Sequence, residues 1–325
     1  MRSRFISILC ALCFGLMMVT FALAEDWPAR PIKLVVPLGA GSAVDVIARL
    51  ISKPLSQGLG TTVYIENIPG ASGILAGEAV AKAAPDGYTL LLSSNTVVSS
   101  NMFLFKSLPY DPVSDFVSIG MVANHSAFVI SASSSLPVSS LSELIAYARA
   151  NPGKVSYAVD VSSSMAFMIG RSLESRASID MQMVPYKSAG QALEDTASGQ
   201  TQVYIGPIGP QAGLIKDHKL KALAVSTATR FPGAEEIPAV AETLPSFNFE
   251  GILFLMAPRG TPSDIINRLN GALGGVLQDQ ELVQRIRQLG FDAPGARTPA
   301  VVDKMLTADR AMWAELTKKF NIERQ

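Results

Sequence analysis

The chain is poor in the residues that most often carry out catalysis or bind metals. It has two cysteines and two histidines among 325 residues. Cys10 and Cys13 both lie in the N-terminal apolar segment, so the rest of the chain has no disulfide, thiolate nucleophile or cysteine metal site. No carboxylate or cysteine stands at metal-ligand spacing from His125 or His218. We therefore expect no catalytic residue, no metal and no cofactor.

An excess of charge of one sign is also missing, as are the motifs of nucleophilic and phosphate chemistry. Lys and Arg together number 27, as do Asp and Glu, and no basic cluster stands out, so nucleic acid is not expected as a partner. The chain has no G-x-S-x-G elbow and no Walker loop. An exported hydrolase is only a weak alternative, because no serine has an evident base.

The N-terminus has the features of an export signal. Two arginines precede a nearly continuous apolar run over residues 6–23, and Ala22-Leu23-Ala24 is a small-x-small cleavage motif. We expect residues 1–24 to be a signal peptide that is cleaved after Ala24, and an uncleaved membrane anchor is the alternative. Cleavage leaves 27 − 2 = 25 basic residues and 27 acidic residues in an exported chain.

Residues 32–49 have the pattern of a strand, a glycine-containing loop and a helix. The apolar run at 32–36 predicts a buried strand, and apolar residues recur after the loop with helical spacing. The start of a helix leaves amide groups unpaired and favours an anion, so we expect a ligand carboxylate here, directly or through water. Gly41 should permit its close approach, and Asp45 should hold the loop in shape. The amides expected to face the carboxylate are those of Leu38, Gly39, Ala40, Gly41, Ser42 and Ala43.

Two alternatives exist for this segment. One is a tight turn that binds no ligand. The other is a dinucleotide site, because Gly39 and Gly41 match the first two glycines of G-x-G-x-x-G and Glu66 ends the next expected strand, where a ribose-binding acid would lie. Val44 stands in place of the third glycine, and free nicotinamide cofactor is not expected outside the cytoplasm. Export therefore counts against this alternative.

Strands and helices alternate over the rest of the chain, which predicts an α/β fold with two parallel-type sheets. We expect lobe 1 to comprise residues 25–124 and 249–325, and lobe 2 to comprise residues 125–248. The chain should cross between the lobes near residues 123–129 and 249–254, with a cleft enclosed between the two lobes.

The last expected helix, over residues 299–320, carries an apolar stripe. Such a stripe marks the buried face of a helix, and we expect it to dock on lobe 1 rather than to bind a ligand. The stripe consists of Met305, Leu306, Met312, Trp313, Leu316 and Phe320.

Small polar residues follow several expected strands, at the sheet edge where α/β proteins bind ligands. They are binding groups rather than acid–base groups, and helix capping is the alternative for the first set. Asp160 either caps a helix or faces the cleft, where it would disfavour a second ligand carboxylate. In lobe 1 the expected site residues of this kind are Ser93, Asn95 and Thr96. In lobe 2 the expected ligand-binding residues are Asp160, Ser162, Ser163, Ser164, Lys187, Ser188, Ala189 and Gly206.

A series of short motifs runs in order along the chain. They include Trp27-Pro28, Val35-Val36-Pro37 before Gly41 and Asp45, Glu66-Asn67 with Pro69-Gly70-Ala71, Pro85-Asp86-Gly87-Tyr88-Thr89, Leu108-Pro109-Tyr110-Asp111-Pro112, Val184-Pro185-Tyr186-Lys187 and Gly260-Thr261-Pro262. From about Trp27 onward the chain resembles the periplasmic substrate-binding proteins of tripartite tricarboxylate transporters, the Bug or TctC-type family. The resemblance implies two α/β lobes joined by two crossing strands, as in type II periplasmic binding proteins. It also implies a small carboxylate, held largely by the first loop and ordered water, and delivery to the membrane permease. We expect the protein to act as a monomer.

Three positions depart from the pattern of that family. The family usually has Pro-Gly-Gly in the first loop, where this chain has Ala40-Gly41-Ser42. Phe167 stands where the family often has His, and Gly206-Pro207 replaces an Asp-Asn pair. Phe167 either belongs to the core or faces an apolar or aromatic ligand body. The resemblance favours a solute-binding protein for a mono-, di- or tricarboxylate, and a ligand sensor that signals to a membrane receptor is the alternative.

Overall fold

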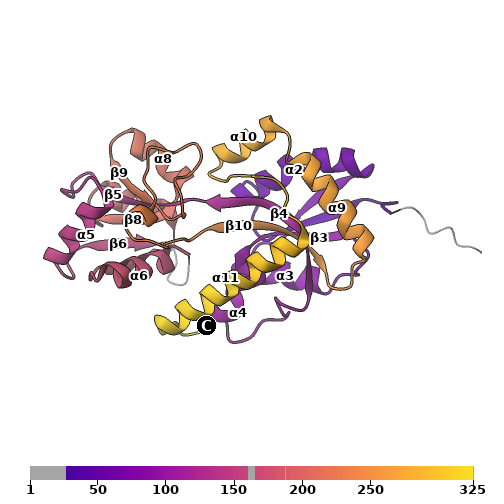
Figure 1. Ribbon diagram of the computed structural model, residues 1–325, viewed down its shortest axis with the longest axis horizontal. Coiled ribbons are helices and arrows are strands. Elements are labelled where there is room, and N and C mark those ends of the chain that lie inside the picture. The colour runs from indigo at the N-terminus through magenta and orange to yellow at the C-terminus, as the bar shows by residue number, and fades with distance from the viewer. Residues whose placement is uncertain (1–26, 160–164, 187, 325) are drawn as a thin grey trace, which may run out of the picture.

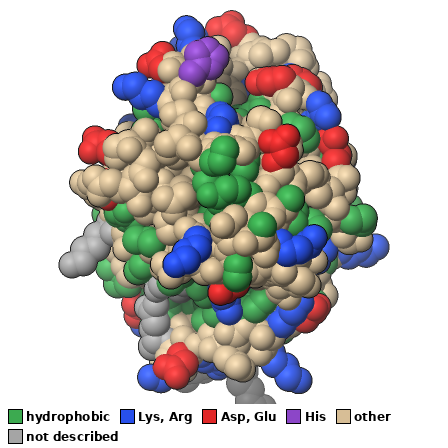
Figure 2. All heavy atoms as spheres, turned by 90° about the vertical axis from the view of Figure 1, so that its left-hand side faces the viewer, with side chains coloured by type: hydrophobic (Ala, Val, Ile, Leu, Met, Phe, Trp, Pro, Cys, Tyr) green, Lys and Arg blue, Asp and Glu red, His purple; other side chains and the backbone are tan. Residues whose placement is uncertain are grey.

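The computed structural model describes residues 27–159, 165–186 and 188–324, which form two five-stranded sheets placed end to end (Figure 1). Helices pack against both sheets. In the described ranges, no helix combines the length and apolar character needed to cross a membrane. Figure 2 shows the end of the molecule formed by the second sheet, where acidic and basic side chains are interspersed rather than gathered by sign.

The first sheet has the strand order β2-β1-β3-β10-β4. β1 pairs in parallel with β2 and β3, whereas β10 is antiparallel to both β3 and β4. Leu34 and Val35 of β1 pack into hydrophobic clusters on opposite faces of the sheet, as expected for a strand covered on both sides. The strands are β1 (Ile32–Val36), β2 (Val63–Asn67), β3 (Thr89–Ser94), β4 (Phe116–Ser126) and β10 (Gly251–Pro258).

Helices cover the two faces of this sheet. One face packs against α2 (Ala43–Leu59), α9 (Ser263–Val276) and α10 (Gln280–Gln288), and the other against α3 (Ile74–Ala81). α2 begins after Ser42, whose side chain accepts a hydrogen bond from the Asp45 amide at 3.2 Å. The short segments are η1 (Ala71–Gly73), the π-helical turn η2 (Thr96–Ser100) and α4 (Asn101–Leu104).

The second sheet has the strand order β7-β6-β8-β5-β9. β6 is parallel to β7 and β8, whereas β5 is antiparallel to β8 and β9. Its strands are β5 (Phe128–Ser133), β6 (Ser156–Val159), β7 (Gln182–Pro185), β8 (Val203–Pro207) and β9 (Leu220–Val225). Its helices are α5 (Leu141–Ala150), α6 (Met165–Ala177), α7 (Ala189–Ala197) and α8 (Ile208–Lys216).

The predicted two-sheet α/β architecture with two crossing strands is confirmed, but both sheets are mixed rather than purely parallel. The reason is the crossing itself. β4 runs out of the first sheet and continues through Ala127 into β5, while β10 returns from the second sheet, so β5 and β10 each enter a sheet against the direction of their neighbours. The two crossing segments pair where Ser126 lies opposite Gly251. The second crossing segment is also held to the end of β9, because the Ser226 hydroxyl donates to the Phe249 carbonyl at 2.8 Å.

The C-terminal helix α11 (Pro299–Lys319) corrects one expectation, because its apolar stripe does not dock on lobe 1 alone. Leu306 belongs to a cluster on the first sheet, whereas Trp313 and Leu316 belong to the core cluster that includes the second sheet. The Arg171 guanidinium of α6 lies 5.8 Å from the ring centre of Phe320, just beyond the helix. α11 therefore extends from one sheet to the other, as its diagonal course in Figure 1 shows.

Candidate functional site

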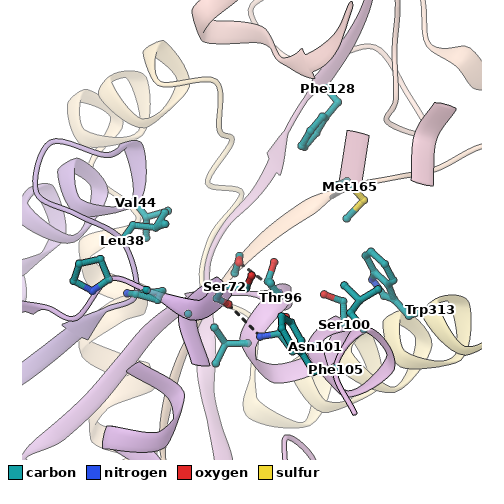
Figure 3. A pocket seen from close by; sticks show the side chains of 17 residues that line it. Leu38, Val44, Ser72, Thr96, Ser100, Asn101, Phe105, Phe128, Met165 and Trp313 are labelled. Carbon is teal, nitrogen blue, oxygen red and sulfur yellow. Dashed lines mark hydrogen bonds between the residues drawn. The ribbon is translucent and has the colours of Figure 1, made fainter. Parts of the chain in front are cut away.

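A cavity of about 500 Å³ lies between the two sheets, at the carboxyl ends of β1 and β3 (Figure 3). Its volume falls in the range of small-molecule sites, and its position is the one where α/β sheets bind ligands. Segments from both sheets and from α11 contribute to it. The lining residues are Pro37, Leu38, Val44, Pro69, Gly70, Ser72, Gly73, Ser94, Thr96, Val97, Ser100, Asn101, Leu104, Phe105, Phe128, Met165 and Trp313.

Asp45 organises the loop after β1. Its Oδ2 accepts a hydrogen bond from the Gly41 amide at 2.8 Å, and its two oxygens each accept one from the Arg49 guanidinium at 3.0 Å. The Asn67 side-chain amide donates to Asp45 Oδ1 at 2.9 Å and to the Leu38 carbonyl at 2.8 Å. The Arg49 hydrogen bonds, with smaller contributions from Gly41 and Asn67, lower the pKa of Asp45 to about 2, so the carboxylate is ionised at neutral pH.

The loop amides are placed differently from the prediction. Asp45 already accepts from the Gly41 amide, and the Ser42 amide donates to the Gly39 carbonyl at 3.2 Å. Of residues 38–43 only Leu38 lines the cavity, so Gly39, Ala40, Gly41, Ser42 and Ala43 lie outside it. A Cβ atom at Gly41 would meet nothing within 4 Å. The φ of +84° at Gly41 by itself favours glycine at this position.

A second loop, between β2 and α3, lines the cavity where the loop after β1 was expected to line it. Gly70, Ala71, Ser72 and Gly73 have φ values of +127°, +45°, +54° and +81°. Positive φ is unfavourable for Ala and Ser, and such backbone strain is concentrated at binding and switch sites. The Asn101 side-chain amide donates to the Ser72 carbonyl at 3.1 Å and supports this conformation. The small-residue run was visible in the sequence, but only the structure shows that it lines the cavity.

The segment after β3 presents two different faces. Thr96 and Ser100 line the cavity, and Figure 3 shows both hydroxyls pointing toward it. Asn95 does not line it, because its amide is buried and donates to Asp309 of α11 at 2.9 Å. Ser93 is also buried outside the lining, and its hydroxyl donates to the Ser94 carbonyl at 3.0 Å. Of the three residues predicted here, only Thr96 reaches the cavity.

The opposite end of the cavity is apolar and was missed by the sequence interpretation. Phe105 directly follows α4, and Trp313 lies in α11. Phe128 begins β5, and Met165 begins α6 (Figure 3). Phe167 does not line the cavity; it packs against the core of the second sheet. A search for polar residues at strand ends cannot find these side chains.

The remaining lobe 2 predictions fall into two groups. Ser188 and Ala189, at the start of α7, do not line the cavity, and Gly206 is buried in β8. The Gly206 carbonyl accepts from the Gln211 side-chain amide at 2.7 Å, and a Cβ at this glycine would lie 2.3 Å from the Tyr204 hydroxyl oxygen. The other predictions fall outside the described residues; these are Asp160, Ser162, Ser163, Ser164 and Lys187.

No charged side chain lines the cavity among the described residues. Glu66, the acid that a dinucleotide site would use, pairs with Lys33 at 3.0 Å. In the described part of the chain, no group of three or more His, Cys, Asp or Glu residues is placed to hold a metal ion. The site thus offers hydroxyls and backbone groups at one end and apolar side chains at the other.

Comparisons with known proteins agree with this geometry. The family model described as "Tripartite tricarboxylate transporter family receptor" matches residues 47–322. A UPF0065 protein of Bordetella bronchiseptica is 34% identical over 306 residues, covering 94% of this chain and 90% of that protein. The structure of Rhodopseudomonas palustris Rpa4515 with adipate has a TM-score of 0.79 and 30% identity over 92% of this chain and 100% of that chain. MatC (Rpa3494) of the same organism, with bound malate, has a TM-score of 0.72 and 29% identity over 89% of this chain and 99% of that chain.

Proposed function

Because this chain belongs to the tripartite tricarboxylate transporter receptor family, we propose that it captures a small carboxylate between its lobes and delivers it to a permease of that type. It is a solute-binding protein of a periplasmic family and not an enzyme. Adipate in Rpa4515 and malate in MatC are the carboxylates that support this choice of ligand.

The observation that carries the proposal is the polar end of the cavity. Ser72, Ser94 and Thr96 contribute polar groups there, beside the positive-φ loop and the carboxyl end of β3. Hydrogen bonds to a charged acceptor are stronger than those between neutral groups, so several neutral donors can hold a carboxylate without a fixed cation. The absence of charge from the described lining fits reversible capture, because release then requires no separation of a buried ion pair.

Thermal unfolding with a panel of mono-, di- and tricarboxylates tests the proposal. A ligand present at about 100 times its Kd should stabilise the fold by about 2.7 kcal/mol, a Tm increase of several degrees. Thr96→Val, which removes one hydroxyl from the cavity, should weaken binding about tenfold or more. Thr89→Val, at the opposite end of β3, is the matched control and should bind normally. A panel without any hit, or a Thr96→Val protein with full affinity, would contradict carboxylate capture at this site.

We further propose the lobe limits 25–124 with 249–325, and 125–248, and rotation of the lobes about the segments that cross between them. The paired residues Ser126 and Gly251 support a hinge at this position. Small-angle scattering should show a smaller radius of gyration once a ligand found by thermal unfolding is added. An unchanged radius at saturation would exclude closure.

The signal cleavage site, the oligomeric state and the permease partner of the protein are also proposals. We propose cleavage after Ala24 and a monomeric mature protein. Intact mass and light scattering of protein purified from the periplasm test both points, since an uncleaved chain or a dimer would appear directly. Delivery to the permease is tested by deleting neighbouring permease genes and measuring uptake of the identified ligand.

A further inference from the structure

The two ends of the cavity differ in chemistry. Ser72 and Thr96 lie at the end near the carboxyl edge of the first sheet, and Figure 3 places Phe128, Met165 and Trp313 above and beyond them. The apolar residues come from separate segments, which are α4 and the residue after it, β5, α6 and α11. Both lobes therefore contribute to one apolar surface that faces a polar floor.

The described residues of the apolar surface include no charged group to neutralise an anion. Among the described lining residues, the polar groups next to it are the Ser100 hydroxyl, the Asn101 side chain and the Trp313 indole nitrogen. That indole nitrogen is buried and has no hydrogen-bond partner among the described atoms. A carboxylate placed here would lose its hydration and gain few donors, because the Asn101 side-chain amide already donates to the Ser72 carbonyl, so the exchange is costly.

Several side chains of this apolar surface are accessible to solvent. Phe105, Phe128 and Met165 are only partly buried. Large apolar side chains left in contact with solvent inside a cavity are typical of a ligand site, because a ligand that covers them removes apolar area from water. The ligand that covers them needs an apolar body.

We propose that the ligand of this site is a monocarboxylate with an uncharged, ring-sized apolar body. The inference rests on the proposed function and narrows its substrate class. The carboxylate binds at the Ser72 and Thr96 end, and the body lies against Phe105, Phe128 and Met165. Dicarboxylates of similar length are disfavoured, because their second carboxylate would be buried on the apolar surface.

Calorimetric titration of the mature protein compares probes that differ in one feature at a time. Benzoate and cyclohexanecarboxylate should each bind at least about tenfold more tightly than acetate, which lacks the apolar body. They should also bind at least about tenfold more tightly than succinate and adipate, which carry a second charge. Equal or tighter binding of succinate or adipate would overturn the monocarboxylate inference while leaving carboxylate capture intact. Benzamide, which keeps the ring and loses the charge, should bind at least about tenfold more weakly than benzoate. If benzamide binds as well as benzoate, the proposed function fails instead.

Single substitutions test the apolar surface itself. Met165→Lys places a cation among the residues facing the ligand body, and it should weaken benzoate binding about tenfold and strengthen adipate binding by a similar factor. Met183→Lys is the matched control, since Met183 is also partly buried in the second lobe but does not line the cavity. If Met165→Lys and Met183→Lys have the same ligand profile, and both have wild-type melting behaviour, the body does not lie against Met165 and the inference is wrong.

Discussion

The side-chain amide of Asn95 donates a hydrogen bond to Asp309 Oδ1 at 2.9 Å and so joins segments 214 residues apart. Asn95 directly precedes the turn that lines the cavity, and Asp309 lies in the middle of α11. The next residue, Arg310, donates to the carbonyls of Val98 and Pro112, each at 2.9 Å. α11 is thus fixed to the back of the cavity wall, while its far end packs with the second sheet.

The buried position of Asp309 predicts a pH-dependent stability. Burial raises the pKa of Asp309, and hydrogen bonds and the neighbouring Arg310 oppose the shift only in part. Between the unfolded-state pKa of 3.8 and the higher folded-state value, the folded chain binds more protons, so the contribution of Asp309 to stability falls as pH rises. Asp309→Asn keeps the acceptor for Asn95 and should be more stable than the wild type at pH 7.

Urea unfolding of wild type and Asp309→Asn across this pH range measures the effect. The advantage of the variant should shrink as pH falls and disappear well below pH 3.8, where the wild-type carboxyl is protonated in both states. Glu315→Gln, an exposed substitution on the same helix, controls for the change in net charge. Parallel curves for the wild type and Asp309→Asn would exclude a role for burial of this carboxyl.

The loop after β1 allows a comparison of two glycines. Gly41 has a φ of +84° and Gly39 does not have a positive φ, while a Cβ at either position would meet nothing within 4 Å. Gly41→Ala should therefore lower the free energy of unfolding by about 1 kcal/mol through backbone strain alone. Gly39→Ala should change it by less than about 0.5 kcal/mol. Chemical unfolding measures both, and equal effects would show that the conformation of Gly41 is not what requires glycine.

The sequence was informative wherever contacts are local. Gly41, Asp45 and Arg49 are spaced four residues apart, so a strand, a glycine turn and a carboxylate that holds the turn could be anticipated. The alternation of strands and helices predicted two α/β sheets because the pattern of each element is also local in the sequence. The direction of β10 could not be inferred from its own residues, because it depends on the return of the chain from the second sheet.

The cavity itself depends on distant contacts. Phe105, Phe128 and Trp313 belong to segments far apart in sequence, and each alone has the pattern of an ordinary core residue. Asn95 was assigned to the ligand because it follows a strand, but its tertiary partner Asp309 takes that amide. Position at a strand end predicts the edge at which a ligand binds, and packing decides which side chains face it.

The network around Asp45 predicts a loss of stability in acid. The folded-state pKa of Asp45 is about 2, below the unfolded-state value of 3.8, so its contribution is present above pH 3.8 and is lost as pH falls toward 2. Since the Arg49 side chain is 55% exposed, we discount the shift for solvent screening and expect Asp45→Asn to cost about 1–2 kcal/mol at pH 6. Unfolding at pH 2 should show little difference between the two proteins.

A matched control for Asp45 is available in the same lobe. Glu66→Gln breaks the more exposed ion pair with Lys33 and should change stability little at either pH. If Asp45→Asn behaves like Glu66→Gln at pH 6, the buried carboxylate does not stabilise the loop.

The two tryptophans of the chain provide an optical test of where the ligand binds. Trp313 lines the cavity, whereas Trp27 contacts Tyr88 with ring centres 6.0 Å apart and does not line the cavity. Titration with a carboxylate that raises Tm should change the emission of Trp313, because a ligand in the cavity changes the environment of the indole. Trp27→Phe should therefore retain the ligand-dependent change, and Trp313→Phe should lose it while still binding in calorimetry. Since Trp313 is 3% exposed, the fold of Trp313→Phe is first checked by thermal unfolding. A ligand-dependent change that persists in Trp313→Phe and disappears in Trp27→Phe would place the ligand away from this cavity.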